Sequence, residues 1–222
     1  MMDINDLSCK IMKLCKEINY NNLEQIEKLL ESYMEHDDNI DLLLRLAVLE
    51  LCPPIMDTER SIDYLKRVLE QSPNNIYAMM LMGYIGNVLC GGISEDLVNE
   101  LRNIETDNLE YRSVIYYLIA WHYYHKKNYI QYKSMLQKSI DYYPLHVNNN
   151  VDLGKHLIGE GHLLEGVKFI KKALENIQHI YSDEEEFDVT DVAEFISEHL
   201  KGTHITKVNL QELVMILEKK RY

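Results

Sequence analysis

The sequence predicts an all-α protein built from repeated helical hairpins. Glycine and proline are scarce, with 9 and 4 among 222 residues, so the chain has few of the residues that punctuate turns. Apolar side chains recur at helical spacing, and short apolar or small pairs recur at a nearly constant interval. These three observations predict an α-α superhelix, or solenoid, of about four to five hairpins with a C-terminal helical cap.

The first two helices follow from the apolar spacing near the N-terminus. Leu7, Ile11, Leu14 and Ile18 stand at i, i+4, i+7 and i+11, which places them on one face of a helix. Apolar residues within 26–33 continue this stripe in a second helix. The two helices together predict a first hairpin.

Five pairs of neighbouring residues reveal the repeat. The second member of each pair is position 15, 49, 83, 120 or 154, so the pairs lie 34, 34, 37 and 34 residues apart. The longer interval predicts extra residues around 90–92. Small side chains at Gly83, Ala120 and Gly154 are expected where the two helices of a hairpin approach closely. The pairs are Leu14-Cys15, Val48-Leu49, Met82-Gly83, Ile119-Ala120 and Leu153-Gly154.

A period of 34 residues is that of the tetratricopeptide repeat (TPR), a helix–turn–helix unit with apolar and small residues at fixed positions. The chain resembles TPR proteins over residues 8–180. Tyr132 stands where the family has a small alanine. On this basis we expect residues 1–222 to form a single helical-repeat domain. The best-matching unit contains Tyr116, Ile119, Ala120, Tyr123, Leu136, Ser139 and Pro144.

Local signals mark the starts of later helices. Ser94 precedes two acidic residues, which predicts a helix N-terminus. Asp191 with Glu194, and Asn209 with Glu212, resemble capping boxes. They predict two helices after the last repeat, so that residues 182–222 form an acidic loop and a cap for the solenoid.

The charge of the chain is strongly negative and unevenly spread. A formal net charge of −13 argues against nucleic-acid binding and favours a basic protein partner. Residues 182–200 contain eight acids and no lysine or arginine. This segment is predicted to cap the solenoid, to bind a partner, or to do both. Its acids are Asp183, Glu184, Glu185, Glu186, Asp188, Asp191, Glu194 and Glu198.

Catalytic motifs are absent from the sequence, and no cofactor or metal is expected. The chain has no glycine-rich phosphate loop, GxSxG or HExxH pattern. His122 and His125 stand at i, i+3, but a metal would need a third ligand that the sequence does not place. The chain has no CxxC pair, so its four cysteines are predicted to be buried free thiols. Without a secretory or membrane-spanning pattern, a cytoplasmic protein is expected.

The resemblance to TPR proteins implies a concave groove lined by the first helix of each hairpin. A group of aromatic residues falls on this surface, and tyrosine and tryptophan are frequent interface hot spots. Each tyrosine could instead fill the core between helices. The groove positions that the resemblance implies include Tyr77, Tyr84, Tyr117, Trp121, Tyr124, His125 and Lys155.

The sequence therefore predicts a non-catalytic protein-interaction module. It would bind a protein or peptide through the aromatic groove, the acidic C-terminal surface, or both. One alternative is an acidic immunity protein that neutralises a basic toxin such as a nuclease. A peptide-sensing regulator and an unrecognised metal-dependent enzyme are further alternatives, and the sequence leaves the oligomeric state open.

Overall fold

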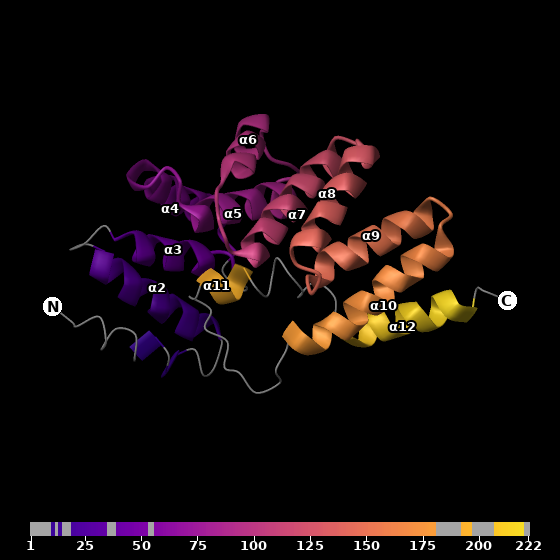
Figure 1. Cartoon of the computed structure of the whole chain (residues 1–222). Coiled ribbons are helices and arrows are strands. Elements are labelled where there is room, and N and C mark those ends of the chain that lie inside the picture. The colour runs from indigo at the N-terminus through magenta and orange to yellow at the C-terminus, as the bar shows by residue number, and fades with distance from the viewer. Residues whose placement is uncertain are drawn as a thin grey trace. The chain divides into compact units, whose positions relative to one another are not determined.

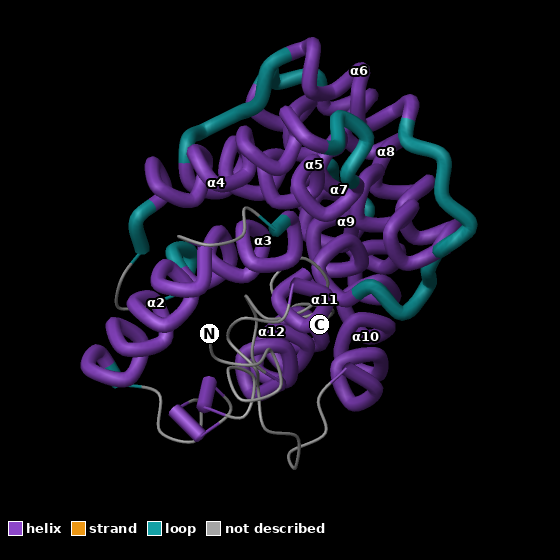
Figure 2. Tube along the Cα trace, turned by 90° about the vertical axis from the view of Figure 1, so that its left-hand side faces the viewer, coloured by secondary structure: helices purple, strands orange, loops and turns teal. Residues whose placement is uncertain are grey.

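The computed structural model describes residues 10, 11, 13, 14, 19–34, 39–52, 56–180, 192–196 and 207–219. Every regular element in these ranges is a helix, which confirms the prediction of an all-α fold (Figures 1 and 2). None of these described helices combines the length and the apolar character that crossing a bilayer requires. Most of the acidic segment, from Asp183 to Asp191 and at Glu198, lies outside the described residues.

The chain divides into two compact units. The first comprises Met1–Met82 with Glu184–Phe195, and the second Gly83–Asp183 with Ile196–Tyr222. In the first unit, α3 packs against α2, α4 and α11. The prediction of a single domain over residues 1–222 stays a prediction. The helices of the first unit are α2 (Tyr20–Met34), α3 (Ile40–Leu49), α4 (Thr58–Gln71) and α11 (Val192–Phe195), and α5 (Ile76–Tyr84) spans the boundary.

The second unit is built from helical hairpins. Helix α7 packs along α8 and α9 packs along α10, while α8 contacts α9 and so joins successive hairpins. Helix α12 covers the last hairpin, because Leu210, Val214 and Leu217 share a buried apolar cluster with α9 and α10. The helices are η1 (Ile85–Leu89), α6 (Glu95–Asn103), α7 (Leu109–His125), α8 (Tyr129–Tyr142), α9 (Val147–Gly159), α10 (Leu163–Ile180) and α12 (Lys207–Lys219).

The repeat positions read from the sequence fall on alternate α-helices. Leu49, Gly83, Ala120 and Gly154 lie in α3, α5, α7 and α9, whereas Cys15 lies outside the described residues. The extra residues of the longer interval appear as predicted, since α5 continues into the π-helix η1 and a loop before α6. In η1 the Cys90 amide donates to the Ile85 carbonyl, five residues back, at 3.0 Å.

Predicted helix starts have mixed outcomes. The Ser94 hydroxyl accepts a hydrogen bond from the Leu97 amide at 3.1 Å, which confirms it as the N-cap of α6. The prediction that Asn209 caps the last helix is wrong, because α12 already begins at Lys207. Asn209 is exposed within the first turn, while the next residue, Leu210, is buried in the core.

The cysteines also depart in part from expectation. Cys52 is buried as predicted, but Cys90 is exposed, so the prediction of burial is wrong for that residue. Cys90 lies directly after η1, where the chain turns into a loop and leaves the core. Cys9 and Cys15 lie outside the described residues.

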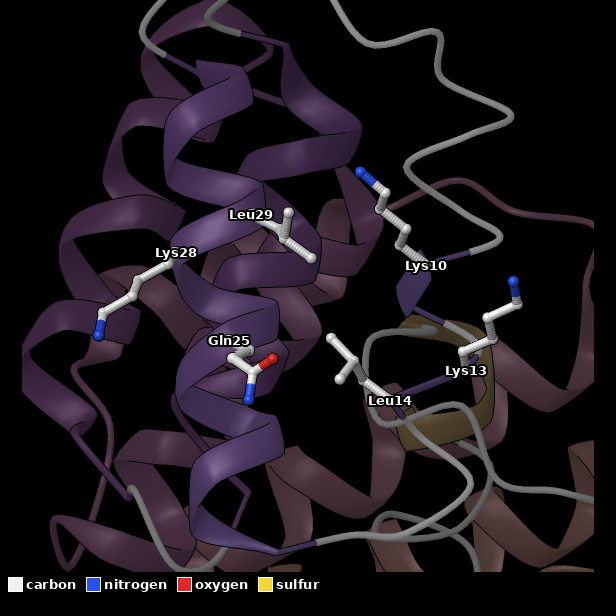
Figure 3. A pocket seen from close by; sticks show the side chains of 6 residues that line it. All are labelled: Lys10, Lys13, Leu14, Gln25, Lys28 and Leu29. Carbon is white, nitrogen blue, oxygen red and sulfur yellow. The ribbon is translucent and has the colours of Figure 1, made fainter.

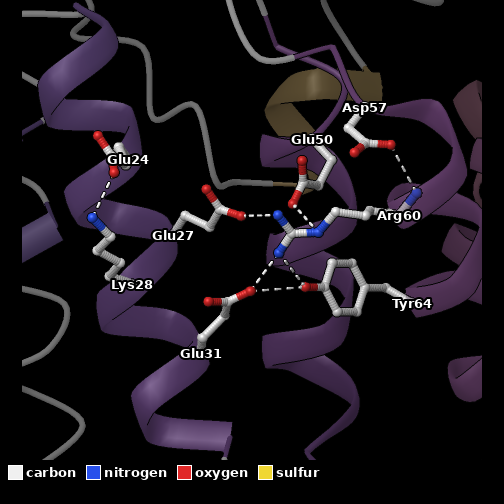
Figure 4. Close-up of polar contacts among 8 residues, drawn as sticks. All are labelled: Glu24, Glu27, Lys28, Glu31, Glu50, Asp57, Arg60 and Tyr64. Atoms are coloured by element: carbon white, nitrogen blue, oxygen red, sulfur yellow. Dashed lines mark hydrogen bonds and ion pairs between the residues drawn. The ribbon is translucent and has the colours of Figure 1, made fainter.

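One guanidinium in the first unit, that of Arg60, pairs with carboxylates from two neighbouring helices (Figure 4). Arg60 of α4 pairs with Glu27 and Glu31 of α2 and, at 3.1 Å from its Nε, with Glu50 at the end of α3. Glu50 is fully buried. Burial and the neighbouring Glu27 raise the pKa of the Glu50 carboxyl to about 7, although Arg60 favours its anion. The stability of this unit therefore depends on pH.

Candidate functional site

Three successive helices of the second unit line a pocket of about 570 Å³. Its volume lies within the range of small-molecule and side-chain pockets in proteins. The lining residues on each helix follow helical spacing, so each helix contributes one face. They are Trp121 and Tyr124 on α7, Tyr129 and Tyr132 on α8, and Asp152, Lys155, His156 and Gly159 on α9, followed by Glu160.

A tight turn sets the aromatic walls of the pocket. Helix α7 ends at His125 and α8 begins at Tyr129, with Asn128 as its N-cap accepting from the Gln131 amide at 3.2 Å. Lys127 has a positive φ of 58°, which allows the chain to reverse within three residues. The last turn of α7 and the first turn of α8 are thus adjacent, and their aromatic side chains meet.

The aromatic rings contact one another in edge and tilted arrangements. The Tyr124 ring centroid lies 5.3 Å from Trp121, 6.1 Å from Tyr129 and 5.2 Å from Tyr132. The His156 ring closes the wall, at 5.4 Å from Tyr132. Such contacts stabilise aromatic pairs beyond their buried area, so the wall is held in place before any ligand arrives.

A partly buried carboxylate, Asp152, lies among these rings. The Tyr117 hydroxyl donates to its Oδ2 at 3.1 Å. Burial raises the pKa of the Asp152 carboxyl to about 6, whereas the Tyr117 hydrogen bond and the Lys155 charge favour the anion. The indole N–H of Trp121 also favours the Asp152 anion. Its Nε1 atom is buried, and its geometry does not meet that of a normal hydrogen bond with the described residues. The carboxylate is thus incompletely compensated.

The other charges at the pocket offset one another. The Glu160 carboxylate pairs with Lys133 of α8 at 3.0 Å and lies 3.4 Å from His156 Nε2. Lys155 is exposed and stands one turn after Asp152. It is the one lysine among the described residues that line the pocket.

The structure brings together part of the groove that the sequence predicts. Trp121, Tyr124 and Lys155 line the pocket, and 43% of Tyr124 is exposed. Tyr117 is buried and supports Asp152. His125 packs beside Trp121 with its Nε2 donating to the Asn87 carbonyl at 2.9 Å.

The described lining of the pocket does not include the other predicted binding residues. Tyr77 belongs to the first unit, and Tyr84 is buried, so its ring offers little surface to a partner. Asp183, Glu184, Glu185, Glu186, Asp188 and Asp191 lie outside the described residues, and Glu194 lies in the short helix α11. Their role in binding stays a prediction.

Six of the nine lining residues were not foreseen as part of a site, namely Tyr129, Tyr132, Asp152, His156, Gly159 and Glu160. The spacing i, i+3, i+4 and i+7 from Asp152 to Gly159 is a readable signal, because it places these residues on one face of α9. The replacement of the family's small alanine by Tyr132 is a second signal. Neither signal predicts a pocket by itself, because the pocket forms only where α8 packs against both α7 and α9.

A serine–histidine pair in the second unit resembles nucleophile chemistry but is sealed from solvent. Ser113 Oγ lies 2.9 Å from His146 Nδ1, and a histidine at this distance can activate a hydroxyl. Both residues are fully buried, as are Ser139 and Asn149, which complete the network. These hydrogen bonds satisfy polar groups between α7, α8 and α9 and so have a structural role.

A second pocket, of about 500 Å³, lies in the first unit between the N-terminal residues and α2 (Figure 3). Leu14, Gln25 and Leu29 line its centre and lysines stand around it. Lys28 is already paired with Glu24 at 2.5 Å. Its described lining holds no buried polar group that would fix a ligand, so the aromatic pocket is the stronger candidate.

Solved structures of MamA resemble the chain in fold. The crystal structure of MamA is 20% identical in sequence, over 81% of this chain and 97% of its own, with a TM-score of 0.58. MamA (41-end) from Desulfovibrio magneticus RS-1 is 16% identical, over 82% of this chain and 99% of its own, with a TM-score of 0.59. No protein-family model and no curated protein sequence matches the chain. The likeness confirms the predicted TPR-like fold of helical hairpins.

Proposed function

We propose that this protein is a non-catalytic interaction module that binds a protein or peptide at the aromatic pocket of α7, α8 and α9. The observation that carries the proposal is the ordered group of rings around Trp121 and Tyr124. Tyr124 and Tyr129 remain 43% and 46% exposed, so they present aromatic surface that a partner can bury. Buried aromatic side chains supply much of the binding energy in protein interfaces.

The helical-hairpin fold supports this proposal in a second way. The pocket residues stand on three helices that pack against one another, not on long loops. A site on packed helices loses little conformational entropy when it binds, which favours affinity. The pair of Ser113 and His146 is the other arrangement that could support chemistry. It is fully buried, so it is not a candidate functional site.

A more specific version of this function is an immunity protein that neutralises a basic toxin. The net charge of −13 supports it, because opposite charge accelerates encounter and selects the partner. In this version the acids from Asp183 to Glu194 contribute to binding together with the pocket. If replacing Glu184, Glu185 and Glu186 with glutamine leaves the association rate with a basic partner unchanged, this version loses its support.

Truncation of Tyr124 is expected to abolish capture of the partner. Tyr124→Ala removes an exposed ring at the centre of the pocket, and loss of such an aromatic anchor weakens binding about 30-fold or more. Immobilised wild-type and variant proteins would be compared for the same partner band from lysate, followed by titration of the isolated partner. The emission of Trp121, the single tryptophan, reports binding at the pocket directly.

Tyr20→Ala is the matched control for this experiment. Tyr20 is also an exposed tyrosine on a helix, but it belongs to α2 in the first unit. We expect it to bind the partner as the wild type does. Equal binding by Tyr124→Ala and wild type, with an unchanged Trp121 emission on complex formation, would exclude the pocket as the binding site.

A further inference from the structure

The chemistry of the pocket points to the kind of group that it accepts. Aromatic faces attract organic cations through their quadrupoles, and arginine and lysine side chains are the common ligands of such walls. Beside the His156 imidazole, four tryptophan and tyrosine rings line the pocket, from Trp121, Tyr124, Tyr129 and Tyr132. A neutral apolar group would also gain from these rings, so a second observation must decide between them.

Asp152 supplies that second observation. Its carboxyl group stands among the rings, where the Tyr117 hydroxyl donates a hydrogen bond to it at 3.1 Å and the Trp121 indole N–H and the exposed Lys155 also favour its anion. An apolar ligand would cover this carboxylate and strip its remaining water, which costs free energy without a compensating partner. A cationic ligand would instead pair with it.

We propose that the pocket takes a cationic side chain, an arginine guanidinium or a lysine ammonium, presented by a basic protein or peptide. The Asp152 carboxylate receives the charge, and the rings of Trp121, Tyr124 and Tyr129 enclose the alkyl stem and the face of the cation. This inference rests on the proposed function and specifies the partner's chemistry. It also agrees with the net charge of −13, which favours basic partners.

Lys155 is the group that opposes a cation in this pocket. Lys155 stands at i+3 from Asp152 and has the same positive charge as the proposed ligand. Its side chain, however, is exposed to solvent. Lys133, which pairs with the lining residue Glu160 at 3.0 Å, already has a carboxylate partner. Removing the charge of Asp152 should therefore weaken the binding of a cation, whereas removing the charge of Lys155, on the same helix face, should strengthen it.

The test uses four capped tripeptides whose central residue is arginine, lysine, glutamine or glutamate. Binding is followed through Trp121 emission and through chemical shifts of the pocket resonances. For the wild type we expect the arginine and lysine peptides to bind at least about tenfold more tightly than the glutamine peptide, which keeps the stem without the charge. The glutamate peptide is expected to bind most weakly.

Two pocket variants and one control separate this proposal from a general loss of structure. Asp152→Asn keeps an oxygen to accept the Tyr117 hydroxyl, and it should remove the preference for arginine over glutamine. Lys155→Gln should strengthen binding of the basic peptides. Glu165→Gln makes the same charge change as Asp152→Asn at an exposed position of α10. It should change neither the preference for arginine over glutamine nor the affinity for the basic peptides.

Several outcomes overturn the proposal. They are equal affinity for the arginine and glutamine peptides, an unchanged preference in Asp152→Asn, tighter binding of the glutamate peptide, or no binding of either basic peptide at tens of millimolar. If the partner is still lost by Tyr124→Ala but kept by Asp152→Asn, the interaction function stands and the cationic ligand falls. If neither variant affects the partner, both fall.

Discussion

Replacing Arg60 with methionine is expected to lower the free energy of unfolding by about 2–3 kcal/mol at pH 8. Removing one partner of a buried ion pair costs about 3–5 kcal/mol, and the lower figure allows for the 40% exposure of the Arg60 side chain. The loss arises because Glu27, Glu31 and the fully buried Glu50 would face one another without a cation. Denaturant unfolding followed by circular dichroism measures it.

The cost of this replacement should depend on pH, because Glu50 has a raised pKa. Its carboxyl has a pKa of about 7 in the folded protein against 4.5 in a solvated chain. Between these values the folded protein keeps a proton that the unfolded chain releases, so the Glu50 contribution to stability falls as pH rises from 4.5 to 7. At pH 5 Glu50 is protonated with or without Arg60, and the effect of Arg60→Met should be smaller than at pH 8.

Two further variants make this prediction specific. Lys66→Met removes a cation from the same helix, but Lys66 pairs with exposed Asp63, so a change within about 0.5 kcal/mol is expected. Glu50→Gln removes the titrating group and should raise stability at pH 8 while flattening its dependence on pH. If Arg60→Met and wild type lose stability in parallel from pH 5 to 8, Arg60 does not act through these carboxylates.

The fold was predictable because its signals are local and periodic. The interval between Leu49, Gly83, Ala120 and Gly154 can be read without knowledge of packing, and the four positions fall on alternate α-helices. The Arg60 cluster was not predictable, because it joins residues from three helices whose side-chain directions depend on how the helices cross. The same reason explains why the sequence predicted the start of α12 at Asn209 and not at Lys207. The first turn of this helix depends on the packing of Leu210 in the cluster that it shares with α10.

The candidate site was predictable in part for the same physical reason. Trp121 and Tyr124 follow from the repeat frame, which predicts that they lie on the groove side of α7. Asp152 and His156 lie on a helix face that the sequence defines, but the ring of Tyr132, which closes the pocket, occupies a position where the family has a small residue. A substitution at a packing position changes which neighbouring side chains meet, and this cannot be derived from one helix alone.

Gly154→Ala is the second replacement with a large expected effect, a loss of about 1–3 kcal/mol in the free energy of unfolding. A Cβ atom at Gly154 would lie 2.8 Å from the Gly166 carbonyl oxygen and 2.8 Å from Ile170 Cδ1. The isoleucine can rotate, but the carbonyl belongs to the backbone of α10, so the two helices must move apart. This outweighs the gain of up to about 1 kcal/mol that alanine brings to a helix.

Gly159→Ala provides the opposite result on the same helix. A Cβ atom there meets no other atom within 4 Å, and its φ needs no glycine, so alanine should stabilise the protein by a few tenths of a kcal/mol up to about 1. Gly166→Ala should be as harmful as Gly154→Ala, since its Cβ would lie 2.5 Å from the Gly154 carbonyl oxygen. Thermal melts of the three variants would show whether this crossing tolerates a methyl group. If Gly154→Ala were instead more stable than the wild type, α9 and α10 would not be in close backbone contact at this position. The small residue of the repeat would then not be explained by the approach of these two helices.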